Sequence, residues 1–243
     1  MKKEILLFTG WGATCDVWSS IIPALSKRYQ VNCHEPSWVC ENKMHSSIRH
    51  FDQYIDELAS QLKHEKYIIA WSMGGLLAIA LAKRYPQLVK KICFISSTAN
   101  FVSQHDEYAG IDFDWFQSFC AQYQAQPVRT LKKFLTLQIK NDVHAKQTLI
   151  ELKKACPFDQ YDLVECGHAL QLLLTLNFKS DLPDLKCSVC YIHGRQDAVV
   201  NTQAVQHCAT LSKSSLHCLD HAGHVPQLSH AQEVLSIIDS EFK

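Results

Sequence analysis

The chain has 243 residues, in which 24 lysine and arginine side chains balance 24 aspartate and glutamate side chains. This length fits one α/β domain that carries an insertion. The charge balance excludes a molecule-wide field that would gather nucleic acid or an anionic membrane, so electrostatic recognition must be local. The eleven cysteines are odd in number and lie in apolar stretches. That usage is unlike a secreted disulfide framework and predicts a reducing cytoplasm.

The first apolar run, at residues 5–8, follows two lysines. It is too short for the apolar core of a signal peptide, and Asp16 soon follows it, so we expect a core strand. The longest apolar candidate elsewhere, at 74–82, falls short of the roughly 18 residues of a spanning helix. The sequence therefore predicts neither a membrane span nor an anchor.

Short apolar runs at 5–8, 67–70, 92–95 and 189–192 predict strands that are buried on both faces of a parallel sheet. Between them, apolar residues recur at three- and four-residue steps over 17–25 and 48–62, which predicts amphipathic crossover helices. This alternation indicates an α/β fold class, with a mostly parallel sheet flanked by helices.

The strand signal disappears between about residues 100 and 185. Helical patterns replace it, at 113–123, 128–137, 145–156 and 168–176. Strands resume near 189 and at 215–219, and a helix is predicted over 231–240. We therefore expect a single domain, with a core of residues 1–99 and 186–243 and an inserted helical cap of about 100–185.

A serine lies at the junction of a predicted strand and a predicted helix. The segment Ala70-Trp71-Ser72-Met73-Gly74-Gly75 follows the run at 67–70 and opens a helical run at 76–84. A serine on so sharp a turn projects its hydroxyl from the carboxyl edge of the sheet, which is typical of a nucleophile elbow. Taken alone, the pattern fits a helix N-cap serine about as well.

Two further segments supply an acid and a base. Asp197 follows one buried strand in Gly194-Arg195-Gln196-Asp197, and His224 follows another in Ala222-Gly223-His224. Serine, acid and histidine in this chain order are typical of α/β-hydrolases. We predict that His224 takes the proton of the Ser72 hydroxyl, while Asp197 fixes the imidazole tautomer and stabilises the imidazolium. Read singly, Asp197 fits a turn residue and His224 a loop histidine.

Acyl transfer also needs hydrogen-bond donors for the tetrahedral oxyanion. The backbone N–H of Met73, directly after the nucleophile, is the first candidate. The second is the backbone N–H of Trp11, in the glycine-containing loop Thr9-Gly10-Trp11-Gly12 after the first strand. The Trp11 indole is a candidate for one wall of the acyl pocket. The alternative is that Trp11 is an aromatic residue of the core, on a turn. No cofactor is needed for this chemistry.

Metal binding is not favoured. Cys187 and Cys190 have the spacing of a zinc hook or redox pair, but side chains three apart on a strand face opposite sides, and no second pair exists. Cys218, His221 and His224 are another conceivable ligand set, yet His224 is required by the triad, and the chain has no HExxH motif. We therefore predict no metal site and expect buried structural thiols.

The predicted cap is locally basic. The segment 126–157 contains seven basic residues and only two acidic ones, Asp142 and Glu151. Such an excess fits either a solvated helix face or a dock for an acidic partner, and composition does not choose between them. The seven are Arg129, Lys132, Lys133, Lys140, Lys146, Lys153 and Lys154.

Three segments make the chain resemble the pimeloyl-[acyl-carrier protein] methyl ester esterases of biotin synthesis. They are Gly10-Trp11-Gly12, Trp71-Ser72-Met73-Gly74-Gly75 and the run from Arg129 to Gln138. The resemblance implies removal of a methyl ester from a pimeloyl chain on an acyl carrier protein. It also implies that Trp11, Ser72, Met73, Phe134, Leu135, Thr136, Leu137, Gln138 and His224 border the substrate, and that Arg129, Lys133 and Lys146 face the carrier protein.

The chain departs from that family pattern at several places. Thr9 and Ala70 replace a histidine and a glycine, no N-terminal hairpin precedes Ile5, and Glu35-Pro36-Ser37-Trp38 stands where a glycine-containing loop is usual. Two alternatives therefore stay open. One is a general carboxylesterase, thioesterase or carbon–carbon hydrolase of the same fold. The other is a non-catalytic, hydrolase-like binding module. Nucleic acid and membrane partners are not expected, and we expect a monomer.

Overall fold

In a computed structural model, which describes residues 2–37, 49–103 and 110–243, six strands form one parallel sheet. The strand order is β2-β1-β3-β4-β7-β8, and every neighbouring pair is parallel. The strands are β1 (Glu4–Phe8), β2 (Gln30–His34), β3 (Lys66–Trp71), β4 (Val89–Ile95), β7 (Ser188–Gly194) and β8 (Ser215–Leu219). The predicted α/β fold class and the four buried strand runs are confirmed.

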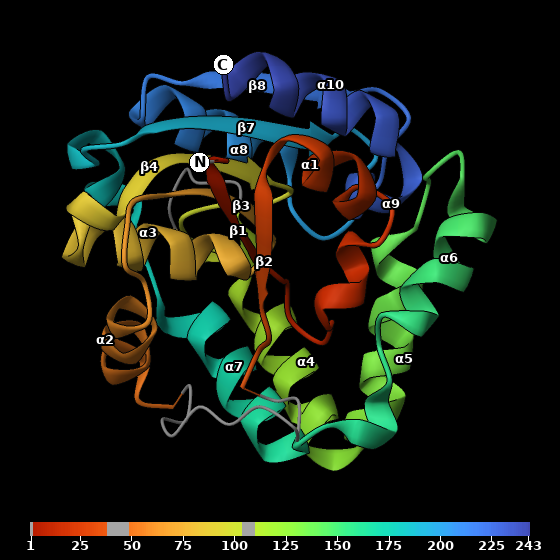
Figure 1. The fold of residues 1–243 in the computed structure, drawn as a ribbon. Helices are drawn as coiled ribbons and strands as arrows, with labels where there is room; N and C mark the ends of the chain where they lie inside the picture. Colours follow the sequence, from red (N-terminus) through yellow and green to blue (C-terminus); the bar gives the residue numbers. More distant parts are fainter. Residues whose placement is uncertain (1, 38–48, 104–109) are drawn as a thin grey trace.

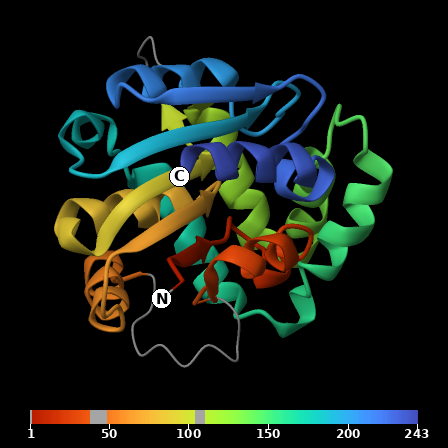
Figure 2. The ribbon, with the colours of Figure 1, turned by 45° about the horizontal axis from the view of Figure 1, so that its top comes forward.

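Helices cover both faces of the sheet, and four of them gather beyond its edge (Figure 1). Figure 2 shows the same sheet turned, with α10 lying across the strands. The flanking helices are α1 (Ile22–Arg28), α2 (Phe51–Ser60), α3 (Gly74–Arg84), α8 (Thr202–Leu211), α9 (Pro226–Ser229) and α10 (Ala231–Glu241). The gathered helices are α4 (Phe113–Ala125), α5 (Pro127–Gln138), α6 (Ala145–Lys154) and α7 (Leu163–Thr175).

The central strands carry little besides apolar side chains because both of their faces are covered. In β3 and β4, Ile68, Ile69, Ile92 and Cys93 have no exposed surface. Helix α3 is buried along nearly its whole length, which explains why its sequence reads as an unbroken apolar run. Among the described residues, no helix is both long and apolar enough to cross a membrane.

Several predicted elements differ in detail. The helix expected over 17–25 is a 3₁₀ turn, Cys15–Trp18, followed by α1, because Pro23 has no N–H to donate and is tolerated only in a helix's first turn. Helix α7 begins at Leu163, earlier than expected, because the Asp162 carboxylate caps its first N–H groups.

The expectation of no strands between 100 and 185 is wrong at two short places. Strands β5 (Val102–Ser103) and β6 (Ile111–Asp112) form a separate parallel pair. Two residues are too few to show an alternating pattern, so the sequence held no signal for them. Strand β2 was also not predicted, because it lies at the sheet edge and is only partly buried.

A disulfide joins Cys15 to Cys33. Sequence reasoning did not anticipate this bond, because the two cysteines are 18 residues apart and lie in different elements, Cys15 in the 3₁₀ turn and Cys33 in β2. Cys187 and Cys190 form no disulfide, and Cys190 is fully buried in β7.

Glu241 at the end of α10 ties that helix to the sheet. Its carboxylate accepts from Lys91 Nζ at 2.9 Å, Ser215 Oγ at 2.6 Å and His217 Nε2 at 2.8 Å. Burial by itself raises the pKa of this carboxyl, but the Lys91 ion pair and the hydrogen bonds together lower the pKa to about 2. The ionised carboxylate therefore stabilises the folded state.

We expect Glu241→Gln to lower the melting temperature at neutral pH. The contribution of a carboxylate with a lowered pKa is present above the ordinary pKa of 4.5 and is lost as the pH falls through about 2. The difference in melting temperature between the two proteins should therefore shrink below pH 4.5. Glu233→Gln, at an exposed site on the same helix, is the control. A difference that is unchanged down to pH 3 would contradict the prediction.

Candidate active site

All six strands of the sheet are parallel, so their carboxyl ends lie at the same edge, which is where open α/β sheets place their sites. The loop after β3 is the turn that carries Ser72. Ser72 adopts a left-handed backbone conformation, with φ of 52°, which is costly for a residue with a side chain. The turn is held because Ser72 N–H donates to Ile95 O at 3.0 Å and Ser97 Oγ donates to Ser72 O at 2.7 Å.

The glycines after Ser72 are required by close packing. A Cβ at Gly74 would lie 2.6 Å from the carbonyl oxygen of Phe8, and a Cβ at Gly75 would lie 2.0 Å from Ser97 Oγ. Larger residues would push α3 away from β1 and β4 and so move the turn. Ala70, the departure from the usual glycine, is completely buried in β3.

The predicted serine, histidine and acid lie in hydrogen-bonding series. His224 Nε2 is 3.0 Å from Ser72 Oγ, and His224 Nδ1 is 2.8 Å from Asp197 Oδ2. The imidazole is completely buried. The other carboxylate oxygen, Asp197 Oδ1, accepts from the backbone N–H groups of Val199 and Val200, at 2.8 and 2.9 Å. The carboxylate is therefore fixed on both sides, as a residue that orients an imidazole must be.

The electrostatics keep Asp197 charged. Burial alone raises its pKa, but the attraction and hydrogen bond of His224 outweigh that effect, so the pKa lies below its usual range. A second histidine, His193, has its Nδ1 3.8 Å from Asp197 Oδ2. Burial lowers the pKa of His193, so this ring stays neutral at physiological pH and does not replace His224 as the partner of Asp197.

The two predicted oxyanion donors flank the serine. In the part of the chain that the structure describes, the backbone N–H groups of Trp11 and Met73 donate to no other residue. The Trp11 loop approaches closely because Gly10 has no side chain: a Cβ there would lie 2.9 Å from Ser72 Cβ. Trp11 itself is anchored, since its indole N–H donates to Cys166 O at 2.8 Å.

A cavity of about 430 Å³ opens at Ser72 and runs between the sheet edge and helices α4, α5 and α7. This volume is in the range of small-molecule sites. Aromatic side chains form part of its walls, and Trp11, Phe119 and Phe134 touch edge to face or tilted, with centroids 5.2–6.0 Å apart. The other apolar side chains that line it are Phe101, Ile111, Trp115, Phe116, Leu137, Leu170, Leu173, Ala198 and Val199.

The structure brings only some of the predicted cap residues to this cavity. Phe134 and Leu137 line it. Leu135 and Gln138 are buried elsewhere, and Thr136 is exposed, with its hydroxyl bonded to the carbonyls of its own helix. The reason is helical geometry, since residues 134 and 137 share a face that 135 and 136 do not.

Sequence reasoning missed the contribution of α4 and of the loop after β7. Trp115, Phe116 and Phe119 are spaced as one apolar helix face, a signal that was present in the sequence. Arg195 is the one basic side chain among the described residues that line the cavity, and its Nε is 2.6 Å from Asp220 Oδ1. No pattern distinguished Arg195 from an ordinary turn residue.

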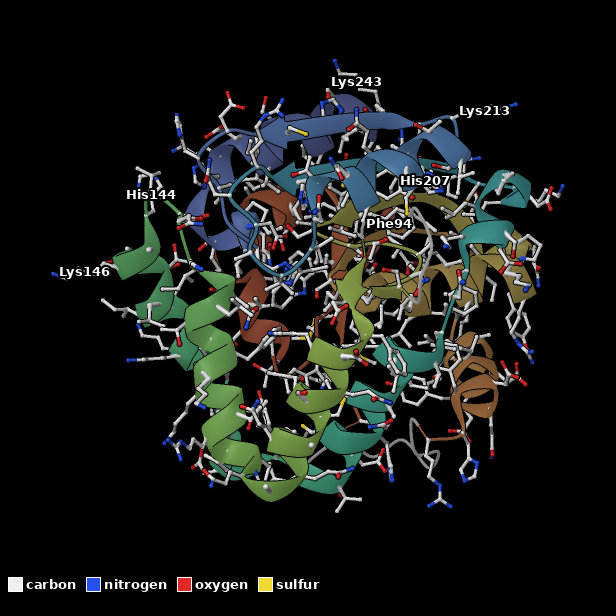
Figure 3. The ribbon with its side chains drawn as sticks, turned by 180° about the vertical axis from the view of Figure 1, so that it is seen from behind. Phe94, His144, Lys146, His207, Lys213 and Lys243 are labelled. Atoms are coloured by element: carbon white, nitrogen blue, oxygen red, sulfur yellow. A yellow bond between two sulfur atoms is a disulfide. The ribbon has the colours of Figure 1, made fainter. Side chains whose placement is uncertain are left out.

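The basic residues of α5 and α6 lie on the outside of the molecule. Arg129, Lys133 and Lys146 are exposed, and Lys146 projects away from the protein (Figure 3). Within the described ranges none of the seven basic residues between 126 and 157 forms an ion pair with the protein's own acids. Those same ranges also hold no group of three or more histidine, cysteine or acidic side chains that could bind a metal.

A parallel sheet of this order, with a serine elbow and an acid and histidine on later loops, defines an α/β-hydrolase. The chain belongs to the α/β-hydrolase fold family, which matches residues 4–231. It is 27% identical to a pimeloyl-[acyl-carrier protein] methyl ester esterase from Aromatoleum aromaticum, over 98% of this chain and 97% of the relative. It is also 27% identical to a protein of the same name from Nitrosomonas europaea, over 98% of this chain and 94% of the relative.

The fold comparison agrees. A bromoperoxidase from Bacillus anthracis superposes with a TM-score of 0.86 at 17% identity, over 98% of this chain and 91% of the other. At that identity the likeness shows the fold alone. The sequence resemblance to the methyl ester esterases is therefore confirmed by the relatives, and the α/β-hydrolase fold by both comparisons.

Proposed function

We propose that this chain is a serine carboxylesterase that hydrolyses the methyl ester of pimeloyl-[acyl-carrier protein] in biotin synthesis. The observation that carries the chemistry is the hydrogen-bonded series from Ser72 through His224 to Asp197, which opens into an apolar cavity. The relatives' names, over nearly the full length of both chains, support the substrate. Helices α4 to α7 serve as the cap within a single domain.

The reaction has two steps. Ser72 Oγ attacks the ester carbonyl while His224 Nε2 takes its proton, and the N–H groups of Trp11 and Met73 hold the oxyanion. His224 then protonates the departing methoxide, which leaves as methanol. In the second step His224 activates a water that hydrolyses the acyl-enzyme and releases the free carboxylate. Asp197 stabilises the imidazolium in both steps.

The cavity fits a flexible chain of methylene groups. Aromatic rings from the Trp11 loop, α4 and α5 and leucines of α5 and α7 line it, so an alkyl chain can be removed from water against them. The exposed basic residues of α5 and α6 supply the contact for an acidic carrier. The cavity and the basic surface are made of different residues, so their roles can be tested separately.

We expect the triple charge reversal Arg129→Glu, Lys133→Glu and Lys146→Glu to lower kcat/KM for the carrier-bound methyl ester by at least about tenfold, because like charges replace complementary ones. Hydrolysis of free dimethyl pimelate should change less than about twofold, since the three residues lie outside the cavity. Both rates can be followed by methanol release. Added salt should weaken the wild-type reaction with the carrier and leave the free ester unaffected.

The matched control is reversal of Lys63, Lys213 and Lys243, which are also exposed. Lys213 and Lys243 lie far from Lys146 (Figure 3). This control should leave both substrates unchanged. Equal losses on carrier-bound and free esters in the α5–α6 variant would refute carrier docking. Failure of the wild-type protein to cleave the carrier-bound ester would refute the proposed substrate.

A further inference from the structure

The turn between α5 and α6 is hydrogen-bonded to the loop that carries His224. Three hydrogen bonds join residues 138–143 to residues 221–224. Val143 N–H donates to His221 O at 3.1 Å, Gly223 N–H donates to Asp142 Oδ2 at 2.7 Å, and His224 N–H donates to Gln138 O at 3.0 Å. We call this set of contacts the clamp. It links the cap helices directly to the proposed general base.

Asp142 is the one side chain among these three bonds. Its side chain is only 1% exposed, so the carboxylate depends on protein donors for its stability. Oδ2 accepts from Gly223 N–H, and Oδ1 accepts from His144 N–H at 2.7 Å. His230 Nδ1 lies 4.0 Å from Oδ2. Asp142 thus joins the start of α6 to the residue immediately before His224.

The same loop is also hydrogen-bonded to the sheet. The indole N–H of Trp71, in β3, donates to His224 O at 2.8 Å. The backbone of His224 is therefore bonded to the cap through its N–H and to the sheet through its carbonyl. Gly223 allows this fit, because a Cβ there would lie 3.0 Å from Gln138 O and 3.3 Å from Asp142 Cβ.

We infer that Asp142 is a positioning residue for the esterase reaction, acting on His224 through the N–H of Gly223; this inference rests on the proposed catalytic role of His224. The imidazole must stay within hydrogen-bonding reach of both Ser72 and Asp197, at 3.0 and 2.8 Å. A shift of about 1 Å in such a group costs up to about 100-fold in rate. Asp142 lines no part of the cavity, so its effect should fall on turnover rather than on substrate binding.

The test is Asp142→Ala, assayed on p-nitrophenyl butyrate. We expect kcat to fall by about 10- to 100-fold while KM changes less than about threefold. Rates are counted per active site, titrated by labelling of Ser72 to completion with a fluorophosphonate, so that unfolded protein does not contribute. The rate constant of that labelling should fall in parallel with kcat, because it too depends on the Ser72–His224 pair.

Asp142→Asn separates positioning from folding. The asparagine has the same shape but only one carbonyl oxygen. Because Gly223 N–H and His144 N–H are bonded to different oxygens of Asp142, that carbonyl can accept from Gly223 N–H but then leaves His144 N–H facing the NH₂ group. We expect it to recover much of the turnover that alanine loses. Asp159→Ala, at an exposed site in the segment between α6 and α7, is the control and should retain wild-type kcat.

A kcat per titrated site within twofold of the wild type in Asp142→Ala would overturn the inference. So would equal losses in the alanine and asparagine variants, because the asparagine retains the acceptor for Gly223. If alanine does not fold, Gly223→Ala decides the matter, because its added Cβ would lie 3.0 Å from Gln138 O and 3.3 Å from Asp142 Cβ and would disturb the clamp. Fluorophosphonate labelling of Ser72 at the wild-type rate in that variant would also overturn the inference. The simple ester makes this readout independent of the carrier-protein substrate.

Discussion

Replacing Ser72 by alanine is expected to lower ester hydrolysis by at least about 10⁴-fold, because the variant has no oxygen to attack the carbonyl. The fold should persist. The Ser72 hydroxyl bonds only to His224 among the described residues, whereas the turn is held through the Ser72 backbone, which alanine retains. The measurements are kcat/KM on p-nitrophenyl butyrate, fluorophosphonate labelling and the melting temperature.

Ser96→Ala is a closely matched control. Ser96 is also buried, follows the adjacent strand β4 and has a left-handed φ of 45°. Its hydroxyl has no hydrogen-bond partner among the described residues, so its loss should leave activity near wild type. Retained hydrolysis or retained labelling in Ser72→Ala would remove Ser72 from the mechanism and revive a non-catalytic binding module.

Replacing Asp197 by asparagine should lower kcat by about 10⁴-fold through the wrong histidine tautomer. Asp197 Oδ1 accepts two backbone N–H groups, at 2.8 and 2.9 Å, so the asparagine carbonyl will keep that position. Its NH₂ group then faces His224 Nδ1 and donates to it. The imidazole proton is forced onto Nε2, which can no longer accept the proton of Ser72.

Asp220→Asn controls for the loss of one negative charge near the site. Asp220 pairs with Arg195 at the surface and touches neither Ser72 nor His224, so kcat should change little. KM for short esters should stay within about threefold in both variants, since neither changes the aromatic walls. A loss below about tenfold in Asp197→Asn would show that the acid does not set the tautomer.

The central strands were predictable because burial on both faces leaves an apolar run that no surface element shares. The runs at 67–70 and 92–95 lie within β3 and β4. Strand β2 and the pair β5 and β6 were not predictable, since a partly buried edge strand and two-residue strands lack that mark. Trp38, in the loop that departs from the family pattern, lies outside the described residues.

The site was predictable where chemistry dictates residue types in a chain order. Ser72, Asp197 and His224 were identified in this way, and the structure places them in hydrogen-bonding contact. Asp142 was not, because in the sequence it is one acid in a basic stretch. Its partner is the backbone N–H of Gly223, 81 residues away. Because almost every residue has a backbone N–H, such a contact cannot be predicted from the residue types.

The clamp has an evolutionary consequence. Helices α4, α5 and α7 are a natural place for substrate preference to diverge, because their residues form much of the cavity wall. Here the same turn that ends α5 also bonds to His221, Gly223 and His224. A chimera that carries the α5–α6 hairpin of another protein would therefore change the cavity wall and also lose the hydrogen bonds that position His224. New preference must then arise by exchange of single wall residues, or by exchange of hairpins that carry an acceptor at the position of Asp142.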